Sequence, residues 1–137
     1  MANTGATSKI NIALEWVIST VNAMGNFATM TRGALGSGNG LTCEIAPSNN
    51  DAVFLDKNAY SALTVTINGK HTNLLTLTDT LNNIVDTLTR LKTYSFGSGW
   101  EIVDITVGLY PRVIGREPDN AWIMAAEIVV KLYRKDD

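Results

Sequence analysis

The feature that most constrains the fold is a pair of alternating runs near the C-terminus, residues 100–110 and 122–133. Alternation at period 2 is typical of a strand with one face buried in a sheet. Between the runs, residues 111–121 contain prolines, a glycine and an Asp-Asn pair, which do not continue a ladder. The pattern therefore predicts a long β-hairpin with an extended tip loop at 111–121. The expected apolar rows are Val103, Ile105, Val107 and Leu109 in the first run, and Trp122, Met124, Ala126, Ile128, Val130 and Leu132 in the second.

The tip of this hairpin carries the candidate functional residues. Its charged side chains mix both signs, as subunit contacts with a defined electrostatic register do. Apolar residues and a tryptophan accompany them, and Trp and Arg are favoured at the centres of protein interfaces. The sequence thus predicts a subunit or partner interface, with a solvated loop of incidental charges as the open alternative. The predicted interface residues are Arg112, Val113, Ile114, Arg116, Glu117, Asp119 and Trp122.

The rest of the chain mixes helices and strands. Helical spacing over residues 8–24 predicts an amphipathic helix, with Ser8 as its N-cap. Two short strands, 27–34 and 41–46, are expected as a hairpin joined by the glycine-rich segment 35–40. Clear alternation over 63–68 predicts a strand that ends at Asn68-Gly69.

A leucine-rich helix is expected to follow His71. Its apolar stripe is typical of a helix packed on a sheet, and His71 itself is expected to have a surface or capping role. Strands and helices do not alternate as in a parallel sheet. The fold class is therefore predicted to be α+β: a mainly antiparallel sheet with two helices on one face and a long C-terminal β-hairpin. The stripe is Leu74, Leu77, Leu81, Ile84, Val85, Leu88 and Leu91.

Size and charge exclude several classes of function. The 137 residues fit a single domain, 1–137, and the net charge of −2 comes without a run of either sign. A sequence-independent nucleic-acid binder needs a basic stripe, so direct nucleic-acid binding is not expected. No span is apolar enough to predict a membrane crossing. Cys43, the single cysteine, is predicted to be a small buried hydrophobe.

Catalytic and metal-binding motifs are missing from the sequence. With one histidine and one cysteine, a zinc site would need mainly carboxylates, which is unusual. No catalytic, cofactor-binding or metal-binding residue is therefore predicted, and the chain is expected not to be an enzyme. The alternative is a small-molecule-binding or enzymatic α+β domain with a polar pocket around His71, Lys70 and Asp104.

The C-terminal half resembles a known family. The resemblance covers residues 63–133 and rests on five stretches. They are Leu63-Thr-Val-Thr-Ile-Asn-Gly-Lys-His71, Leu88-Thr-Arg-Leu-Lys-Thr-Tyr94, Trp100-Glu-Ile-Val-Asp-Ile105, Pro111-Arg-Val-Ile-Gly-Arg-Glu-Pro-Asp-Asn-Ala-Trp-Ile123, and Ala126-Glu-Ile-Val-Val-Lys-Leu-Tyr133. These are similar to the small minor capsid or tail terminator proteins of bacteriophages of Gram-positive bacteria. The glycine-rich segment 33–40 matches nothing in that family.

The resemblance implies a structural virion protein assembled in the host cytoplasm. Such a subunit forms a hexameric ring at the tail–neck junction, ends polymerisation of the tail tube and offers a docking face to the head. The implied partners are other copies of the chain, the tail tube protein, a head-completion or neck protein and, in a contractile tail, the sheath protein. DNA would pass through the ring without specific binding. A head-completion or connector protein of the neck is the alternative within phages.

Overall fold

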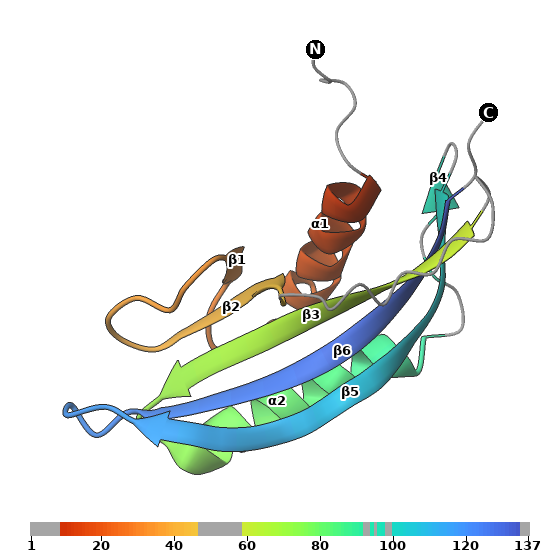
Figure 1. Cartoon of the computed structure of the whole chain (residues 1–137). Helices are drawn as coiled ribbons and strands as arrows, with labels where there is room; N and C mark the ends of the chain where they lie inside the picture. Colours follow the sequence, from red (N-terminus) through yellow and green to blue (C-terminus); the bar gives the residue numbers. More distant parts are fainter. Residues whose placement is uncertain (1–8, 47–58, 92–93, 95, 98–99, 135–137) are drawn as a thin grey trace.

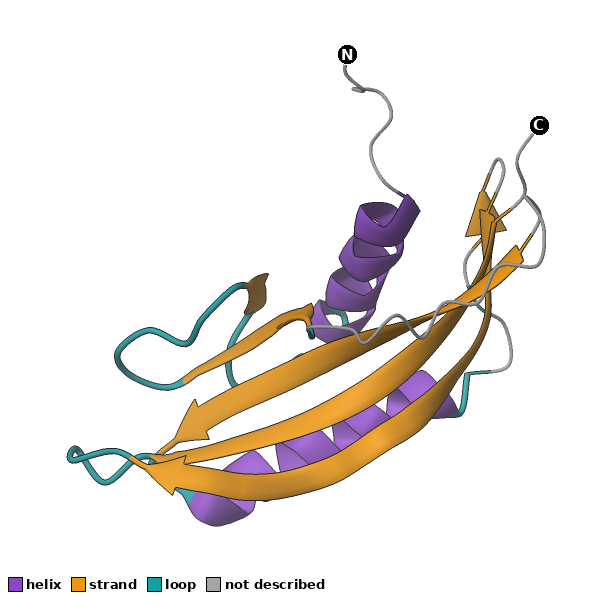
Figure 2. Ribbon diagram, in the orientation of Figure 1, coloured by secondary structure: helices purple, strands orange, loops and turns teal. Residues whose placement is uncertain are grey.

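The computed structural model describes residues 9–46, 59–91, 94, 96–97 and 100–134. Within these residues, two helices and six strands form an α+β fold with a single sheet, in the strand order β1-β2-β3-β6-β5-β4 (Figures 1 and 2). Every pairing is antiparallel except that of β1 with β2, so the predicted fold class is confirmed. The elements are α1 (Lys9–Asn22), β1 (Met30–Arg32), β2 (Gly40–Ile45), β3 (Ala59–His71), α2 (Leu74–Thr89), β4 (Phe96–Gly97), β5 (Trp100–Arg116) and β6 (Trp122–Arg134).

One apolar core lies between the sheet and the helices. Because β3 and β6 pair in an unbroken register, Ile67 lies opposite Ala126 and Val65 opposite Ile128, so their inward rows meet on one face. α2 runs behind β6 and β5 in Figure 1. α1 contacts α2 and β1. Both helices bury their stripes in this core. The inward residues of the central strands are Leu63, Val65 and Ile67 on β3, and Met124, Ala126, Ile128, Val130 and Leu132 on β6.

The start of α2 is fixed by two side chains that cap it. The Asn73 carboxamide oxygen accepts a hydrogen bond from the Thr76 N–H at 3.0 Å, as an N-cap residue does. His71 Nδ1 in turn accepts from the Asn73 N–H at 2.8 Å. The His71 ring also meets Phe27 edge to face, with 4.7 Å between ring centroids. The expected capping role of His71 is confirmed. The stripe of α2 is buried at Leu77, Leu81, Ile84, Val85 and Leu88.

One polar and one aromatic contact hold α1 in place. Asn22, in the last turn of α1, donates to the Met30 carbonyl at 3.2 Å and accepts from the Met30 N–H at 2.7 Å, so it braces β1. Trp16 meets Tyr94 edge to face, and the Tyr94 hydroxyl donates to the Leu88 carbonyl at 3.0 Å, near the end of α2. Burial and then the nearby Asp104 carboxylate raise the pKa of Tyr94, which keeps this hydroxyl a donor. The predicted N-cap, Ser8, lies outside the described residues.

The expected hairpin of the two short strands is wrong. β1 runs parallel to β2, with Met30 beside Leu41 and Arg32 beside Cys43. A parallel neighbour normally requires a longer crossover. Here β1 has only 3 residues, so the loop 33–39 can carry the chain back to its start. Gly33 begins this loop in the left-handed region, at φ 111°, where glycine is unstrained.

The expected end of β3 at Asn68-Gly69 is also wrong, because β3 continues to His71. Gly69 faces the core rather than a turn. A Cβ there would lie 2.7 Å from Leu77 Cδ1 and 3.3 Å from Leu41 Cδ2. The glycine is therefore needed for the close packing of α2 on β3.

No helix in the described part of the chain is both long and apolar enough to cross a membrane.

Candidate assembly interface

The strand β5 is longer than predicted, and this changes the nature of the tip. Residues 111–116 are strand rather than loop, because β5 runs to Arg116. Pro111 lies in a register shift between Leu109 and Arg112, where it is not required to donate to the ladder. The prediction of a tip loop at 111–121 is therefore wrong for its first half. The candidates Arg112, Val113, Ile114 and Arg116 all lie on the strand.

Four register shifts interrupt the pairing of β5 with β6, between Ile102 and Asp104, Val107 and Leu109, Leu109 and Arg112, and Val113 and Gly115. Each extra residue changes which face the following side chains point to. The predicted inward row on β5 is therefore only partly right. Ile105 is buried, but Val103 and Leu109 are exposed.

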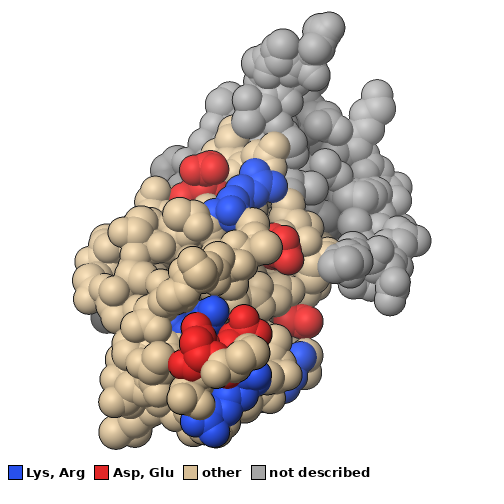
Figure 3. All heavy atoms as spheres, turned by 90° about the vertical axis from the view of Figure 1, so that its left-hand side faces the viewer, with Lys and Arg blue, Asp and Glu red and all other residues tan. Residues whose placement is uncertain are grey.

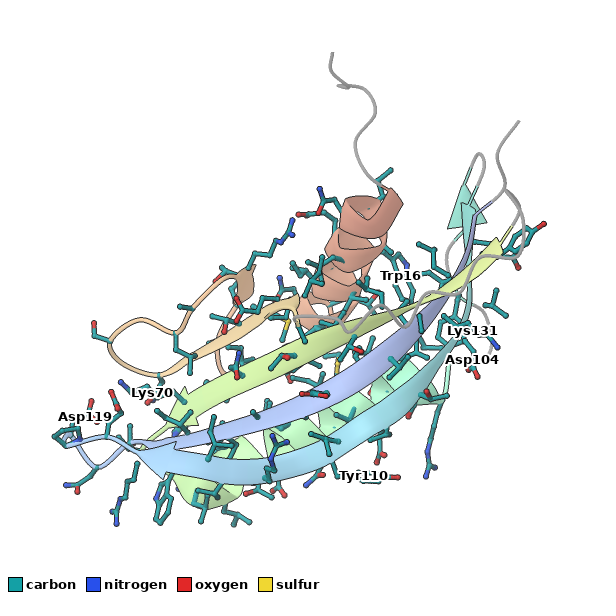
Figure 4. The ribbon with its side chains drawn as sticks, in the orientation of Figure 1. Trp16, Lys70, Asp104, Tyr110, Asp119 and Lys131 are labelled. Atoms are coloured by element: carbon teal, nitrogen blue, oxygen red, sulfur yellow. The ribbon has the colours of Figure 1, made fainter. Side chains whose placement is uncertain are left out.

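These shifts expose a cluster of apolar side chains along β5, which we call the edge patch: Val103, Leu109, Tyr110, Val113 and Ile114. Three of its members, Val103, Tyr110 and Ile114, occupy the shifts themselves. Tyr110 is 68% exposed and Ile114 is 52% exposed. In Figure 4 Tyr110 lies beyond the outer side of β5. Exposed apolar side chains gathered on one element are typical of an interaction site.

The outer side of β5 is also an open sheet edge. Within the described residues, β4 pairs only with Trp100 and Glu101, so nothing pairs with this outer side of β5 from Ile102 to Arg116. Unpaired N–H and C=O groups on such an edge can accept a strand of another chain. The exposed side chains of the edge patch and the unpaired backbone groups thus lie along the same strand.

The true tip of the hairpin is the short turn 117–121. The Asn120 N–H donates to the Glu117 carbonyl at 2.9 Å, and the Glu117 N–H donates to the Ala121 carbonyl at 2.8 Å. Asn120 has φ 69°, in the left-handed region that Asn tolerates. The Asp119 carboxylate accepts from the Ala121 N–H at 3.1 Å. The turn is therefore a defined structure held by its own hydrogen bonds.

Lys70 ties this turn to β3. Its ammonium lies 3.5 Å from Glu117 Oε1 and 3.7 Å from Asp119 Oδ2, and its side chain is only 5% exposed. Figure 4 shows Lys70 and Asp119 close together at one end of the sheet. A buried ammonium requires charged partners, so these carboxylates have a structural role. We call this group the Lys70 latch.

Arg116 and Trp122 form a second internal contact at the base of the turn. The Arg116 guanidinium lies 4.3 Å from the centroid of the Trp122 ring, within the range of a cation–π interaction. Figure 3 shows the end of the molecule that carries the turn, where basic and acidic atoms lie side by side. Much of the mixed charge predicted for an interface is therefore paired within the chain.

The predicted interface residues consequently separate into two groups. Glu117, Asp119, Arg116 and Trp122 make contacts that shape the tip. The remaining three, Arg112, Val113 and Ile114, are exposed on the β5 edge.

Leu109, Tyr110 and Lys70 also belong to this region, although they were not predicted as interface or tip residues. A signal for the first two was present, since Gly108 and Pro111 flank them and such residues in a strand indicate a bulge. Lys70 had no local signal, because its partners are distant in sequence.

The residues of the alternative polar pocket do not come together. Lys70 pairs across to Ile123 and Asp104 to Lys131, eight positions apart on β6, which is about 27 Å at the rise of a strand. His71 is engaged in capping α2. Among the described residues, no three His, Cys, Asp or Glu side chains form a possible metal site. Cys43 is buried, and burial raises the pKa of its thiol to about 11, so it is not a nucleophile near neutral pH.

A solved structure contains a chain similar in fold to this protein. No protein-family model and no curated protein matches this sequence. The solved structure, described as the virion of a native gene transfer agent particle, contains a chain with the same fold. The TM-score is 0.64 and the identity is 11%, over 90% of this chain and 94% of that one. The fold thus occurs in a virion, and it extends over nearly the full length of both chains.

Proposed function

We propose that this protein is a structural subunit of a phage or phage-like virion, and specifically a tail terminator. In this role several copies, six by the family resemblance, form a ring at the head-proximal end of the tail tube. The ring ends tube polymerisation and presents a docking face to the head-completion or neck protein. The subunit acts by fitting against other subunits and does not transform a substrate.

The observation that carries the proposal is the shared fold with a virion chain over 90% of this chain. The family resemblance of residues 63–133 points in the same direction. The three residues of the alternative polar pocket, Lys70, Asp104 and His71, do not come together.

The exposed β5 edge suits the ring. A closed ring requires a heterologous contact, in which one patch meets a different patch on the neighbour. The edge patch, with Arg112 beside it, supplies an apolar surface with a charge for orientation. The latched turn 117–121 extends past the core as a rigid projection, which suits a contact with the tube or the neck.

The proposal is tested by imaging particles in which this chain carries Arg112→Ala and Ile114→Ala. Both side chains are exposed, so the subunit should keep its melting temperature within about 2 °C. We expect tails of abnormal length or heads without tails, because the ring no longer closes. Electron microscopy measures both defects.

A matched control is Asp79→Ala and Asn82→Ala on the exposed side of α2, which should leave particles normal. Normal tail length and normal head joining in the Arg112/Ile114 variant would contradict a role of the edge in the ring. A map of the intact neck decides the position of the subunit. Density for this chain on the head side of the junction, away from the tube, would assign it to a connector instead.

A further inference from the structure

We propose that the free protein forms a two-fold dimer, in which the β5 edges of two copies lie antiparallel about an axis near Gly108. The inference concerns the chain before assembly. It stands whether or not the assembled form is a terminator ring.

The first observation is the open apolar edge. From Ile102 to Arg116, the side of β5 that faces away from β6 has no strand beside it within the described residues, and the edge patch exposes five large apolar side chains. A long edge of this kind associates readily with other strands. In a free subunit, covering the edge removes apolar surface from water.

The second observation is the order of charges along the edge. The exposed acids Glu101 and Asp104 lie towards one end, and the exposed bases Arg112 and Arg116 towards the other. An antiparallel partner reverses this order, so opposite charges meet. A parallel partner would bring like charges together. The surface is therefore complementary to itself, as a two-fold contact requires.

The register follows from the positions of the side chains. With the axis at Gly108, Asp104 lies opposite Arg112 of the second copy, and Val103 opposite Val113. Both pairs consist of exposed side chains, one pair charged and one apolar. A Cβ on Gly108 would lie against Glu127 and Val129 of β6, so the position of the axis rests on the two side-chain pairs alone.

The groups around the charged pair are consistent with this contact. Asp104 accepts a hydrogen bond from its neighbour's N–H, that of Ile105, at 2.9 Å, and it lies beside Lys131 of β6 (Figure 4). These contacts orient its carboxylate while leaving Asp104 exposed. Arg112 lies opposite Ala125 on β6 and makes no ion pair within the described part of the chain.

The register shifts keep the contact weak. They divide the edge into short pieces, of which 104–107 is the longest regular one, so a continuous ladder between copies is not possible. Side chains must carry most of the association. A contact limited to short pieces of one strand is weaker than a permanent interface, and we expect a dissociation constant on the order of micromolar. A weak dimer can release the edge when a growing tail offers a better partner.

The test is sedimentation velocity of the full chain over a range of concentrations. We expect a concentration-dependent dimer for the natural sequence. Asp104→Lys and Arg112→Glu should each be monomeric, because each places two like charges at both ends of the contact. An equal mixture of the two variants should form a dimer again. In that mixed pair the introduced lysine faces the introduced glutamate, and the unchanged Arg112 of one variant faces the unchanged Asp104 of the other.

The mixture separates the contact from local damage. Asp104→Lys places a second cation near Lys131 and lowers stability somewhat, but such a loss is not repaired by adding another variant. Asp86→Lys, at an exposed position on α2, is the matched control and should dimerise like the natural sequence.

A strict monomer up to about 200 µM, well above a micromolar dissociation constant, would overturn the inference. So would a dimer unaffected by both charge reversals, or the absence of a dimer in the mixture. A closed hexamer formed directly from monomers would also overturn it, while supporting the proposed ring. Failure of the dimer and failure of the ring are therefore distinguishable.

Discussion

The two sides of β6 differ sharply. Towards β3, its register runs without a break from Ala59 opposite Arg134 to His71 opposite Trp122. Towards β5, the register is interrupted four times, although β5 is the longer strand, with 17 residues against 13. One strand thus has a regular neighbour on one side and a bulged neighbour on the other.

This difference separates the strands that form the core from the strand edge that we propose for contacts with other chains. An unbroken register keeps every second side chain on the core face, so β3 and β6 supply most of the buried rows of the sheet. The shifts in β5 turn Val103, Leu109 and Tyr110 away from the core. The regular centre therefore stabilises the subunit, and the bulged edge carries the exposed side chains that we propose for contacts with other chains.

The same substitution on the two sides should have very different effects. Ile128→Asp on β6 places a charge without a partner in the core, and we expect a loss of at least about 4 kcal/mol in unfolding free energy. Ile114→Asp at a shift in β5 should change it by no more than about 0.5 kcal/mol. Urea denaturation of the free subunits measures both. Equal losses would mean that the β5 edge belongs to the core.

Two glycine substitutions extend this comparison, and the larger of their expected losses of stability is of intermediate size. Gly69→Ala on β3 puts a methyl group 2.7 Å from Leu77 Cδ1, and we expect a loss of about 1–3 kcal/mol. Gly115→Ala on β5 has no heavy atom within 4 Å and should be nearly neutral. Combining Gly69→Ala with Leu77→Ala should reduce the cost of the first change, because the second opens space. An unchanged cost in that double-mutant cycle would exclude the clash as its cause.

The Lys70 latch joins the two regions, and breaking it should cost less than a charge in the core. Glu117→Gln with Asp119→Asn leaves the Lys70 ammonium without a charged partner. Because both carboxylates are about half exposed, we expect a loss of only about 1–2 kcal/mol. Hydrogen exchange should quicken at the turn 117–121 but not in the centre of β3.

Adding Lys70→Met to that variant is the control for the latch. It removes the unpaired charge and should recover most of the lost stability. Exchange that quickens equally along the whole of β3 would show that the latch supports the regular centre as well.

The sequence alone was sufficient for the elements with an uninterrupted period. The leucine stripe of α2 and the alternation of β6 predicted helix, strand and most of the core rows correctly, because each pattern reports burial on one continuous face. Leu91 lies beyond the end of α2, and Leu74 and Trp122 are only partly buried. The capping role of His71 and the burial of Cys43 were also predicted correctly. The terminator role, the ring and the partners stay predictions.

The errors arise where distant residues decide the local structure. Gly69 looked like a turn because its packing partners, Leu77 and Leu41, are not adjacent in sequence. The alternation of β5 broke at Val103 because pairing with β6 introduces a shift there. Glu117 and Asp119 looked free to contact another subunit, but their partner Lys70 lies on β3.

The bulges of β5 have a further consequence for how such a chain diverges. Side chains at the shifts stand outside the interior, so they can be replaced to suit a new neighbour without repacking the protein. Adaptation to different partners and preservation of the architecture then place demands on separate positions. Two chains can in this way share a fold with few identical residues, as this one and the gene transfer agent chain do at 11% identity.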